Sequence, residues 1–381
     1  MLSDFLDTKP LYYDTIDYTR MPRAYESVKE QLKLPKIIHI IGTNGKGTTG
    51  RFLASALYAM GYNTGHYTSP HILEFNERIW LNGKNIDTQT LEDAHQHLLT
   101  LLTPQMAHSL SYFEYTTLLA IVVYQKCDFI VLEAGLGGEH DATAVFENIL
   151  TLVTPIDKDH EAFLGDTITQ IATTKLNAIQ KEALIGKQLH QEVLKVARKL
   201  EKEKNITCYN YNTQLNTQDR VNIQTIAVKL QLPEYLQDNL ALSIATLKKL
   251  NIPYKLEHFN DSKLFGRLTP FTKNILLDVG HNTLAAQSIA KTLQGRKYIL
   301  IYNTYKDKNY KAILEILQPI IDYVTLIDVN EDRIETPQKL HATLEELNIA
   351  YSSFNETQED KNYLVFGSFS VVESFLRSYN G

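Results

Sequence analysis

The sequence predicts an α/β protein of two domains, an N-terminal domain with a mainly parallel sheet and a smaller α/β domain at the C-terminus. The length of 381 residues suits two or three domains of ordinary size. Short apolar runs rich in β-branched residues alternate with segments of helical period, as in βαβ units. The stretch 261–270, which contains a glycine and a proline, separates two such series and is the candidate domain junction. We therefore predict an N-terminal domain at 1–262, a linker at 263–267 and a C-terminal domain at 268–381.

The first series begins with Ile-Ile-His-Ile-Ile at 37–41, a nearly unbroken apolar run that is typical of a strand buried on both faces. A glycine-rich turn at 42–47 follows. The next segment, 48–60, places its apolar residues on one helical stripe, and Gly61 stands where a C-terminal cap is expected. The same alternation then predicts helices at 115–126 and 167–179 and strands at 129–132 and 149–153.

The pattern weakens in the middle of the chain and returns near the C-terminus. Residues 198–220 are rich in Lys, Glu, Asn and Gln and predict no chemistry, although 206–209 is strand-like. Helical period resumes at 232–250. Beyond the linker the sequence predicts a Rossmann-like domain with strands at 274–277, 298–302, 323–327 and 363–366.

Composition narrows the class of protein. A net charge of -6 argues against a general nucleic-acid binder. Two cysteines far apart, Cys127 and Cys208, indicate a reducing, cytoplasmic setting. We expect no signal peptide and no membrane span, since no apolar run approaches about 20 residues.

The turn after the first strand has the composition of a phosphate-binding loop. Glycines let the backbone wrap an anion, and the helix that follows presents free N–H groups. Lys46 can reach the β- and γ-phosphates of a nucleotide, and the Thr48 hydroxyl can bind Mg²⁺. Gly47 separates Lys46 from Thr48, so the strict pattern GxxxxGK[ST] is not met, and a turn without a ligand is the alternative. We predict that this P-loop-type domain binds ATP through Gly42, Thr43, Asn44, Gly45, Lys46, Gly47 and Thr48.

A series of motifs in order along the chain resembles the folylpolyglutamate synthase/dihydrofolate synthase family of the Mur ligase superfamily. The similar segments are GTNGKGT at 42–48, TSPH at 68–71, NERI at 76–79, FEY at 113–115, LEAGLGG at 132–138, DAT at 141–143, DH at 159–160, DVGHN at 278–282 and, more weakly, KDK at 306–308 and GS at 367–368. The resemblance implies that ATP and Mg²⁺ (one or two ions) activate a folate-type carboxylate as an acyl phosphate, which L-glutamate then attacks. Dihydropteroate, a folate, or both would be the acceptor.

The resemblance also implies roles for individual residues. Lys46, His160, Lys175 and His281 would be catalytic, with Lys175 carbamylated. Thr48, Ser69, Glu114, His160 and Lys175 would hold metal. From the residues alone, the favoured interpretations are a surface or capped loop histidine for His160 and a lysine on a helix face for Lys175. On the nucleotide, Asn239 would lie near the adenine, Asp278 near the ribose and Arg267 near phosphate or adenine.

The folate side is predicted at Thr68, His71, Tyr112, Phe113 and Asp141, since aromatic rings could stack on a pterin and a carboxylate could pair with its edge. The aromatic residues could instead belong to the core.

Glu139 and Ala144 depart from the arginine and asparagine usual in the family, which could alter the folate form accepted. A Mur-type ligase of nucleotide-linked muramyl peptides and a non-catalytic ATP-binding regulator are the alternatives. We expect a monomer that binds neither nucleic acid nor membrane.

Overall fold

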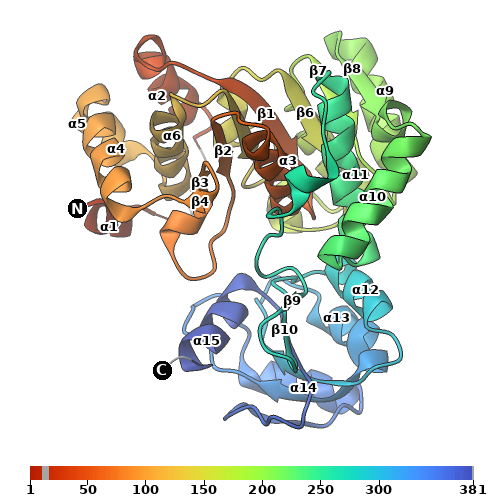
Figure 1. The fold of residues 1–381 in the computed structure, drawn as a ribbon. Coiled ribbons are helices and arrows are strands. Elements are labelled where there is room, and N and C mark those ends of the chain that lie inside the picture. Colours follow the sequence, from red (N-terminus) through yellow and green to blue (C-terminus); the bar gives the residue numbers. More distant parts are fainter. Residues whose placement is uncertain (11–16, 380–381) are drawn as a thin grey trace. The chain divides into compact units, whose positions relative to one another are not determined.

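The computed structural model describes residues 1–10 and 17–379, which form two compact units, Met1–Lys263 and Leu264–Gly381. Both units are layered α/β structures, which confirms the predicted fold class (Figure 1). The break between them falls inside the segment 263–267 that the sequence assigns to a linker. No helix in the described part of the chain is long and apolar enough to cross a membrane.

The first unit is built on an eight-stranded sheet in the order β4-β3-β2-β5-β1-β6-β7-β8. Neighbours from β2 to β8 pair in parallel, whereas β3 and β4 add an antiparallel edge. Its strands are β1 (Lys36–Ile41), β2 (Thr64–Tyr67), β3 (Ile79–Leu81), β4 (Lys84–Asn85), β5 (Phe129–Glu133), β6 (Leu150–Val153), β7 (Glu182–Ile185) and β8 (Thr207–Asn210).

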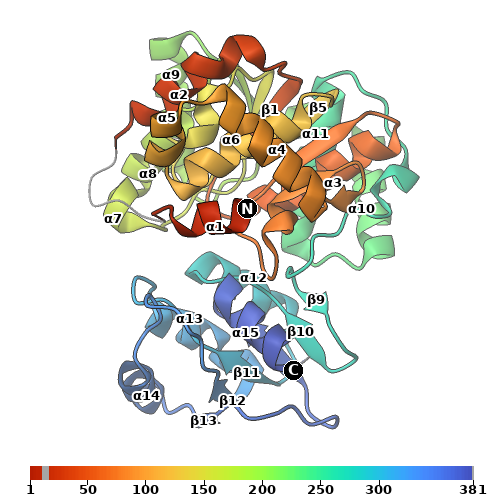
Figure 2. The same ribbon diagram turned by 90° about the vertical axis from the view of Figure 1, so that its left-hand side faces the viewer.

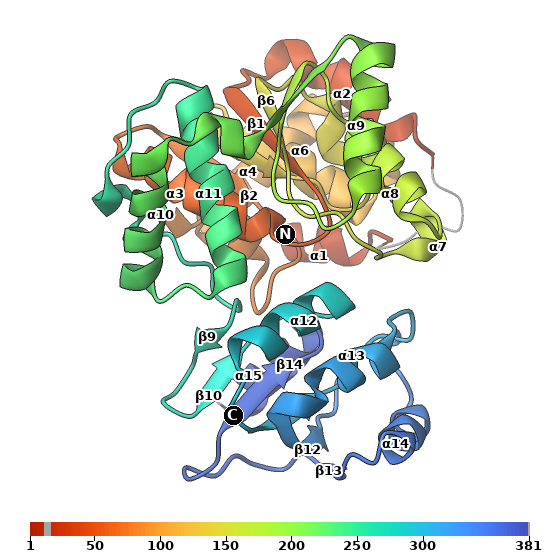
Figure 3. The same cartoon turned by 90° about the vertical axis from the view of Figure 1, so that its right-hand side faces the viewer.

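Helices cover both faces of this sheet (Figures 2 and 3). They are α1 (Leu2–Asp7), α2 (Arg20–Val28), α3 (Lys46–Ala59), α4 (Thr88–Leu101), α5 (Pro104–Ser109), α6 (Tyr112–Tyr124), α7 (Glu161–Leu164), α8 (Ile168–Leu176), α9 (Gln191–Lys204), α10 (Thr217–Leu230) and α11 (Glu234–Lys249). Short 3-10 turns lie at Lys29–Gln31, Phe75–Arg78, Ala142–Val145, Tyr211–Gln214 and Leu256–Phe259. Ile38 and Ile40 of β1 point to the core under α3, α10 and α11, while Ile37 and Ile41 pack on the opposite side.

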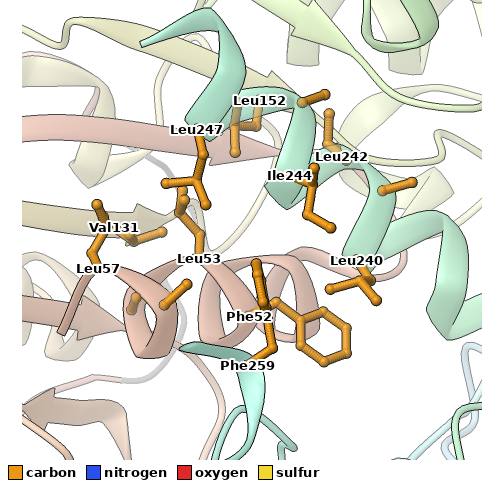
Figure 4. Packing of buried hydrophobic residues seen from close by; sticks show 14 of the residues in the cluster. Phe52, Leu53, Leu57, Val131, Leu152, Leu240, Leu242, Ile244, Leu247 and Phe259 are labelled. Atoms are coloured by element: carbon orange, nitrogen blue, oxygen red, sulfur yellow. The ribbon is translucent and has the colours of Figure 1, made fainter. Parts of the chain in front are cut away.

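The helix that follows the glycine-rich turn is held by a dense apolar contact. Phe52 and Leu53 of α3 meet Leu240 and Ile244 of α11, with Val131 of β5 close by (Figure 4). These side chains are almost fully buried. Burying one such side chain stabilises the fold by roughly 1.5–3 kcal/mol, so this packing holds the middle of α3 against α11.

The second unit contains a six-stranded sheet in the order β13-β12-β11-β14-β10-β9, parallel except for β9. Its strands are β9 (Thr269–Pro270), β10 (Ile275–Leu277), β11 (Tyr298–Tyr302), β12 (Ile321–Leu326), β13 (Tyr351–Ser353) and β14 (Tyr363–Phe366). Its helices are α12 (Thr283–Thr292), α13 (Tyr310–Leu317), α14 (Pro337–Glu346) and α15 (Phe369–Tyr379), with a 3-10 turn at Gln318–Ile320. All five residues of β11 are buried, as expected for a central parallel strand.

Candidate active site

The glycine-rich turn between β1 and α3 has a backbone that side chains would not permit. Gly42 has φ +142°, and a Cβ atom there would lie 2.0 Å from the Thr154 hydroxyl and 2.9 Å from the Thr154 carbonyl oxygen. Gly45 has φ +87° at the N-cap of α3, and a Cβ there would lie 2.5 Å from Oδ1 of Asn239. The free N–H groups at the start of α3 suit this glycine-rich turn to phosphate binding, and we call residues 42–47 the phosphate turn.

The same turn is anchored to the segment after β6. The backbone N–H groups of Thr43 and Asn44 both donate to the carbonyl oxygen of Pro155, at 2.8 and 3.3 Å. The Thr43 hydroxyl donates to the carbonyl oxygen of Asp157 at 3.0 Å. Because β6 neighbours β1 in the sheet, these bonds fix the turn against the rigid part of the unit.

Lys46, the first residue of α3, faces a buried carboxylate. Its Nζ lies 3.7 Å from Oε1 of Glu133, and the two side chains are 14% and 5% exposed. Glu133 ends β5, directly opposite Ile40 of β1. The Thr68 hydroxyl donates to the other Glu133 oxygen. The structure therefore joins the phosphate turn and the loop after β2 through one carboxylate.

Thr48 supplies a buried hydroxyl without a hydrogen-bond partner. The side chain is 1% exposed, and its Oγ1 contacts no donor or acceptor within residues 1–10 and 17–379. An unsatisfied buried hydroxyl costs about 1–3 kcal/mol. A ligand or metal ion at this position would remove that cost, so the hydroxyl fits Mg²⁺, which prefers oxygen donors.

Lys175 of α8 reaches the phosphate turn from the other side. Its Nζ donates to the carbonyl oxygen of Gly42 at 3.0 Å, and the side chain is buried. Burial and the nearby Lys46 ammonium lower the pKa of Lys175 to about 7, against the opposing effect of Asp159 and Asp141. A large neutral fraction of this amine exists near neutral pH, and the neutral amine is the form that can react with carbon dioxide.

His160 lies at the N-cap of the short helix α7 with φ +53°. Its Nε2 is 4.0 Å from Oδ1 of Asp159, and its side chain is 35% exposed. Since Asp159 also acts on the pKa of Lys175, this loop and α8 belong to one electrostatic group. This geometry is compatible with His160 as a loop histidine and with His160 as a metal ligand.

The predicted folate residues gather beside these groups. The ring of Phe113, in the first turn of α6, fills the space over Gly135, where a Cβ would lie 2.5 Å from its Cζ. The Phe113 ring is 5.9 Å from that of Tyr67, next to Thr68. His71 and Tyr112 both contact Arg78, which is described below.

Asp141 is buried and its carboxylate is used within its own loop. Its oxygens accept from the backbone N–H of Leu136 at 2.8 Å and that of Thr143 at 2.9 Å, and also from the Thr143 hydroxyl. Burial raises the pKa of Asp141, although these hydrogen bonds oppose the shift. A bound pterin would therefore have to share a carboxylate that already folds the loop 135–141.

Among the predicted nucleotide and catalytic residues, Arg267, Asp278 and His281 lie in the second unit. Asn239 lies in α11 of the first unit. The Asp278 carboxylate follows β10 and accepts from the N–H groups of Leu268 and Gly280, both at 2.8 Å. Arg267 donates to the carbonyl oxygen of Gly266 at 3.0 Å, with its guanidinium 5.3 Å from the Phe369 ring centre. His281 is two residues further on, with its Nδ1 3.2 Å from the Val279 carbonyl oxygen. Within this unit, the three predicted side chains thus flank the carboxyl end of β10.

Known proteins resemble the chain along nearly its whole length. No family model matches it. The dihydrofolate synthase/folylpolyglutamate synthase of Haemophilus influenzae is 30% identical over 403 residues, covering 92% of this chain and 91% of that protein. The chain belongs to the dihydrofolate synthase/folylpolyglutamate synthase family.

Solved structures agree with this membership. The folylpolyglutamate synthetase of Helicobacter pylori is 37% identical, with a TM-score of 0.81 over 100% of this chain and 98% of that one. The folylpolyglutamate synthase of Mycobacterium tuberculosis, complexed with ADP, shares the fold at 21% identity, with a TM-score of 0.83 over 100% and 97% of the two chains. The family's two-domain α/β architecture is therefore that of this protein.

The structure does not bring all the metal ligands implied by the family resemblance into one cluster. Glu114 accepts from Arg20 Nε and from the Ser111 backbone N–H, both at 2.7 Å, so it closes the capping box of α6 and forms a half-buried ion pair. Ser69 is half-buried, one residue after Thr68. Nowhere in the described chain do three or more His, Cys, Asp or Glu side chains converge as a metal cluster. Glu133, which the sequence interpretation left without a role, is the carboxylate that the structure brings to Lys46.

Glu133 carries a signal that could have identified it. It is the single charged residue at the end of the otherwise apolar run 129–133. A carboxylate that ends a buried parallel strand lies at the sheet edge where α/β proteins bind ligands.

Proposed function

We propose that this protein is an ATP-dependent ligase that joins L-glutamate both to dihydropteroate and to reduced folates. The observation that carries the proposal is the phosphate turn with Lys46, Glu133 and the unsatisfied Thr48 hydroxyl, in a chain of this family. No observation favours the Mur-type ligase or the regulator over this reading.

The reaction divides into two displacements. A carboxylate oxygen of the acceptor attacks the γ-phosphorus of ATP, the bond to the β-phosphate oxygen breaks, and ADP leaves. The amine of glutamate then attacks the acyl carbon, inorganic phosphate leaves, and the amine loses a proton. Such phosphoryl transfer depends mainly on positioning and on neutralising negative charge.

The residues of the site suit these needs. The N–H groups at the start of α3 would bind phosphate oxygens, and Lys46 would neutralise charge on the transferred group. A divalent ion would be held by Thr48 and Glu133, with Ser69 and His160 as further candidates. That ion would supply charge neutralisation at the phosphates. We assign Glu114 a structural role in place of the metal role implied by the resemblance, because its Oε2 already accepts from Arg20 and from the Ser111 backbone N–H.

Carbamylation of Lys175, with a second metal ion, is part of the proposal. Its support is the lowered pKa of Lys175 and the contact with Gly42. We also propose a monomer of the cytoplasm, in accord with two cysteines that form no disulfide.

The test measures ADP release with Mg²⁺-ATP and glutamate, with dihydropteroate or tetrahydrofolate in separate reactions. Release with both acceptors supports the bifunctional ligase, whereas release with one assigns a single activity. Release with neither, despite measured ATP binding, would overturn the proposal and favour the Mur-type or regulatory alternatives.

A further inference from the structure

Arg78 places a guanidinium group among aromatic rings on the predicted folate side. Its Cζ lies 5.2 Å from the ring centre of Tyr112 and 6.0 Å from that of Phe75. Its Nε donates to Nδ1 of His71 at 2.8 Å. Tyr67 is also close, since the charge of Arg78 opposes the burial that raises the pKa of Tyr67. The group is thus held in place by His71 and by ring faces.

The remaining N–H groups of Arg78 have no acidic partner in the described chain. Its hydrogen bond to His71 uses Nε alone, and no carboxylate of residues 1–10 or 17–379 lies within ion-pair distance. The adjacent Glu77 does not compensate, because its oxygens accept from the backbone N–H groups of Ile72, Leu73 and Glu74 at 2.8–2.9 Å. A half-buried guanidinium presents a fork of donors that matches a carboxylate.

The position of Arg78 relates it to the phosphate turn. Its backbone carbonyl oxygen accepts from the N–H of Thr68 at 3.0 Å, and the Thr68 hydroxyl binds Glu133, which pairs with Lys46. A substrate whose reacting carboxylate lies at Lys46 can therefore extend past Thr68 toward Arg78. All of these residues belong to the first unit.

The two proposed acceptors differ in the groups they offer to this cation. Dihydropteroate has one carboxylate, the one that reacts. A folate ends in a glutamyl residue with two carboxylates, and the γ-carboxylate reacts while the α-carboxylate does not. We propose that Arg78 binds the non-reacting α-carboxylate of glutamyl acceptors and so determines how well the protein elongates folates. This inference rests on the proposed ligase function.

The direct test replaces Arg78 by methionine, which keeps an unbranched apolar stem but removes the guanidinium and its charge. We expect kcat/KM for tetrahydrofolate to fall by about 10- to 100-fold, mainly through KM, because a charge-assisted hydrogen bond is lost. With dihydropteroate, kcat/KM should stay within about threefold of the wild type. Arg377→Met is the matched control, since Arg377 is 58% exposed on α15 and pairs with Glu373 on the same helix.

The outcomes separate the two proposals. Equal losses with both acceptors, or a raised KM for glutamate with both, would overturn the role of Arg78 while leaving the ligase function intact. No ADP release by the wild type with either acceptor would instead overturn the ligase function itself.

A second measurement needs no variant, in case Arg78→Met does not fold. The wild-type protein is assayed with tetrahydrofolate and with the analogue whose α-carboxylate is an uncharged amide. The amide should be used about 10-fold or more less efficiently. Equal kcat/KM for the acid and the amide would contradict the inference.

Discussion

Replacing Lys46 by methionine tests the phosphate site most directly, because it removes the ammonium and keeps an apolar stem of similar length. The structure places this ammonium at the first residue of α3, 3.7 Å from Oε1 of Glu133. Loss of one preorganised charge-stabilising group from an enzyme site costs about 2.7–4 kcal/mol of transition-state stabilisation. We therefore expect kcat for ADP formation to fall by about 10²- to 10³-fold.

The same replacement has a consequence for stability that can be worked from the pair itself. At 3.7 Å and an effective dielectric constant of about 20, the attraction of two unit charges is about 4 kcal/mol. Desolvation offsets much of it, but removing Lys46 takes a compensating positive charge away from the buried Glu133 carboxylate. We expect each of Lys46→Met and Glu133→Gln to lower the free energy of unfolding, with the double variant less destabilised than the sum by about 1–3 kcal/mol.

The assay combines ADP release at saturating substrates with urea unfolding of the two single variants and the double variant. Lys199→Met is the control, since Lys199 is 72% exposed on α9 and pairs with Glu203 four residues along. A Lys46→Met protein with kcat within about threefold of the wild type would refute the assignment of the phosphate site. Strict additivity of the two stability changes would refute the pairing.

Three further changes test other parts of the argument. Glu114→Gln should lower the free energy of unfolding by about 1–3 kcal/mol and leave the Mg²⁺ concentration for half-maximal activity within about threefold of the wild type. Glu133→Gln should raise that Mg²⁺ concentration at least about 10-fold. The reverse pattern in a Mg²⁺ titration would show that Glu114 is the ligand. Burial depresses the pKa of Lys175 from 10.5 to about 7, so between these pH values the unfolded chain binds more protons than the folded chain. In buffer free of carbon dioxide, the free energy of unfolding should therefore rise with pH by up to about 1.4 kcal/mol per pH unit. Lys175→Met should lack that part of the slope, and equal slopes for the variant and the wild type in urea unfolding would disprove a neutral buried amine. Leu53→Ala should lower the free energy of unfolding by about 2–5 kcal/mol, because it opens a cavity between α3 and α11, and a loss below about 1 kcal/mol would show that this contact does not hold α3.

The fold was predictable where a local pattern coincides with burial. Strand 37–41 and helix 48–60 appear as β1 and α3, and 129–132 appears as β5, because their apolar patterns match the faces they bury. Within 181–230 the strand-like piece 206–209 appears as β8, whereas β7, α9 and α10 were not predicted. The apolar residues of α9 do recur at helical spacing (Val193, Val196, Ala197 and Leu200), so this helix could have been predicted. In contrast, β8 is a sheet-edge strand with exposed ends and a weak apolar pattern.

The site was predictable as a set of loops but not as a set of contacts. The glycines of the phosphate turn predict that other atoms come close to its backbone. In the structure, Thr154 lies close to Gly42 and Asn239 lies close to Gly45. No local pattern could show that the Glu114 carboxylate is taken by Arg20, which is 94 residues away in sequence. The pairing of Lys46 with Glu133 is equally non-local, since it depends on β5 lying next to β1.

Glu139 illustrates how a departure from a family pattern can be explained by its contacts. Its carboxylate accepts from Nδ2 of Asn177 at 2.7 Å, and its backbone N–H donates to the Thr174 carbonyl oxygen at 3.0 Å. Any side chain at Gly138 would meet the Lys175 backbone, at 2.5 Å from its carbonyl oxygen. The loop 135–141 therefore packs tightly on the end of α8 that carries Lys175, while Gly135, at its other end, lies under Phe113. An acidic residue at 139 fits this role because it accepts from the side-chain amide of Asn177, the C-cap of α8. The change from arginine can therefore be explained by anchoring of the loop without any contact to the folate.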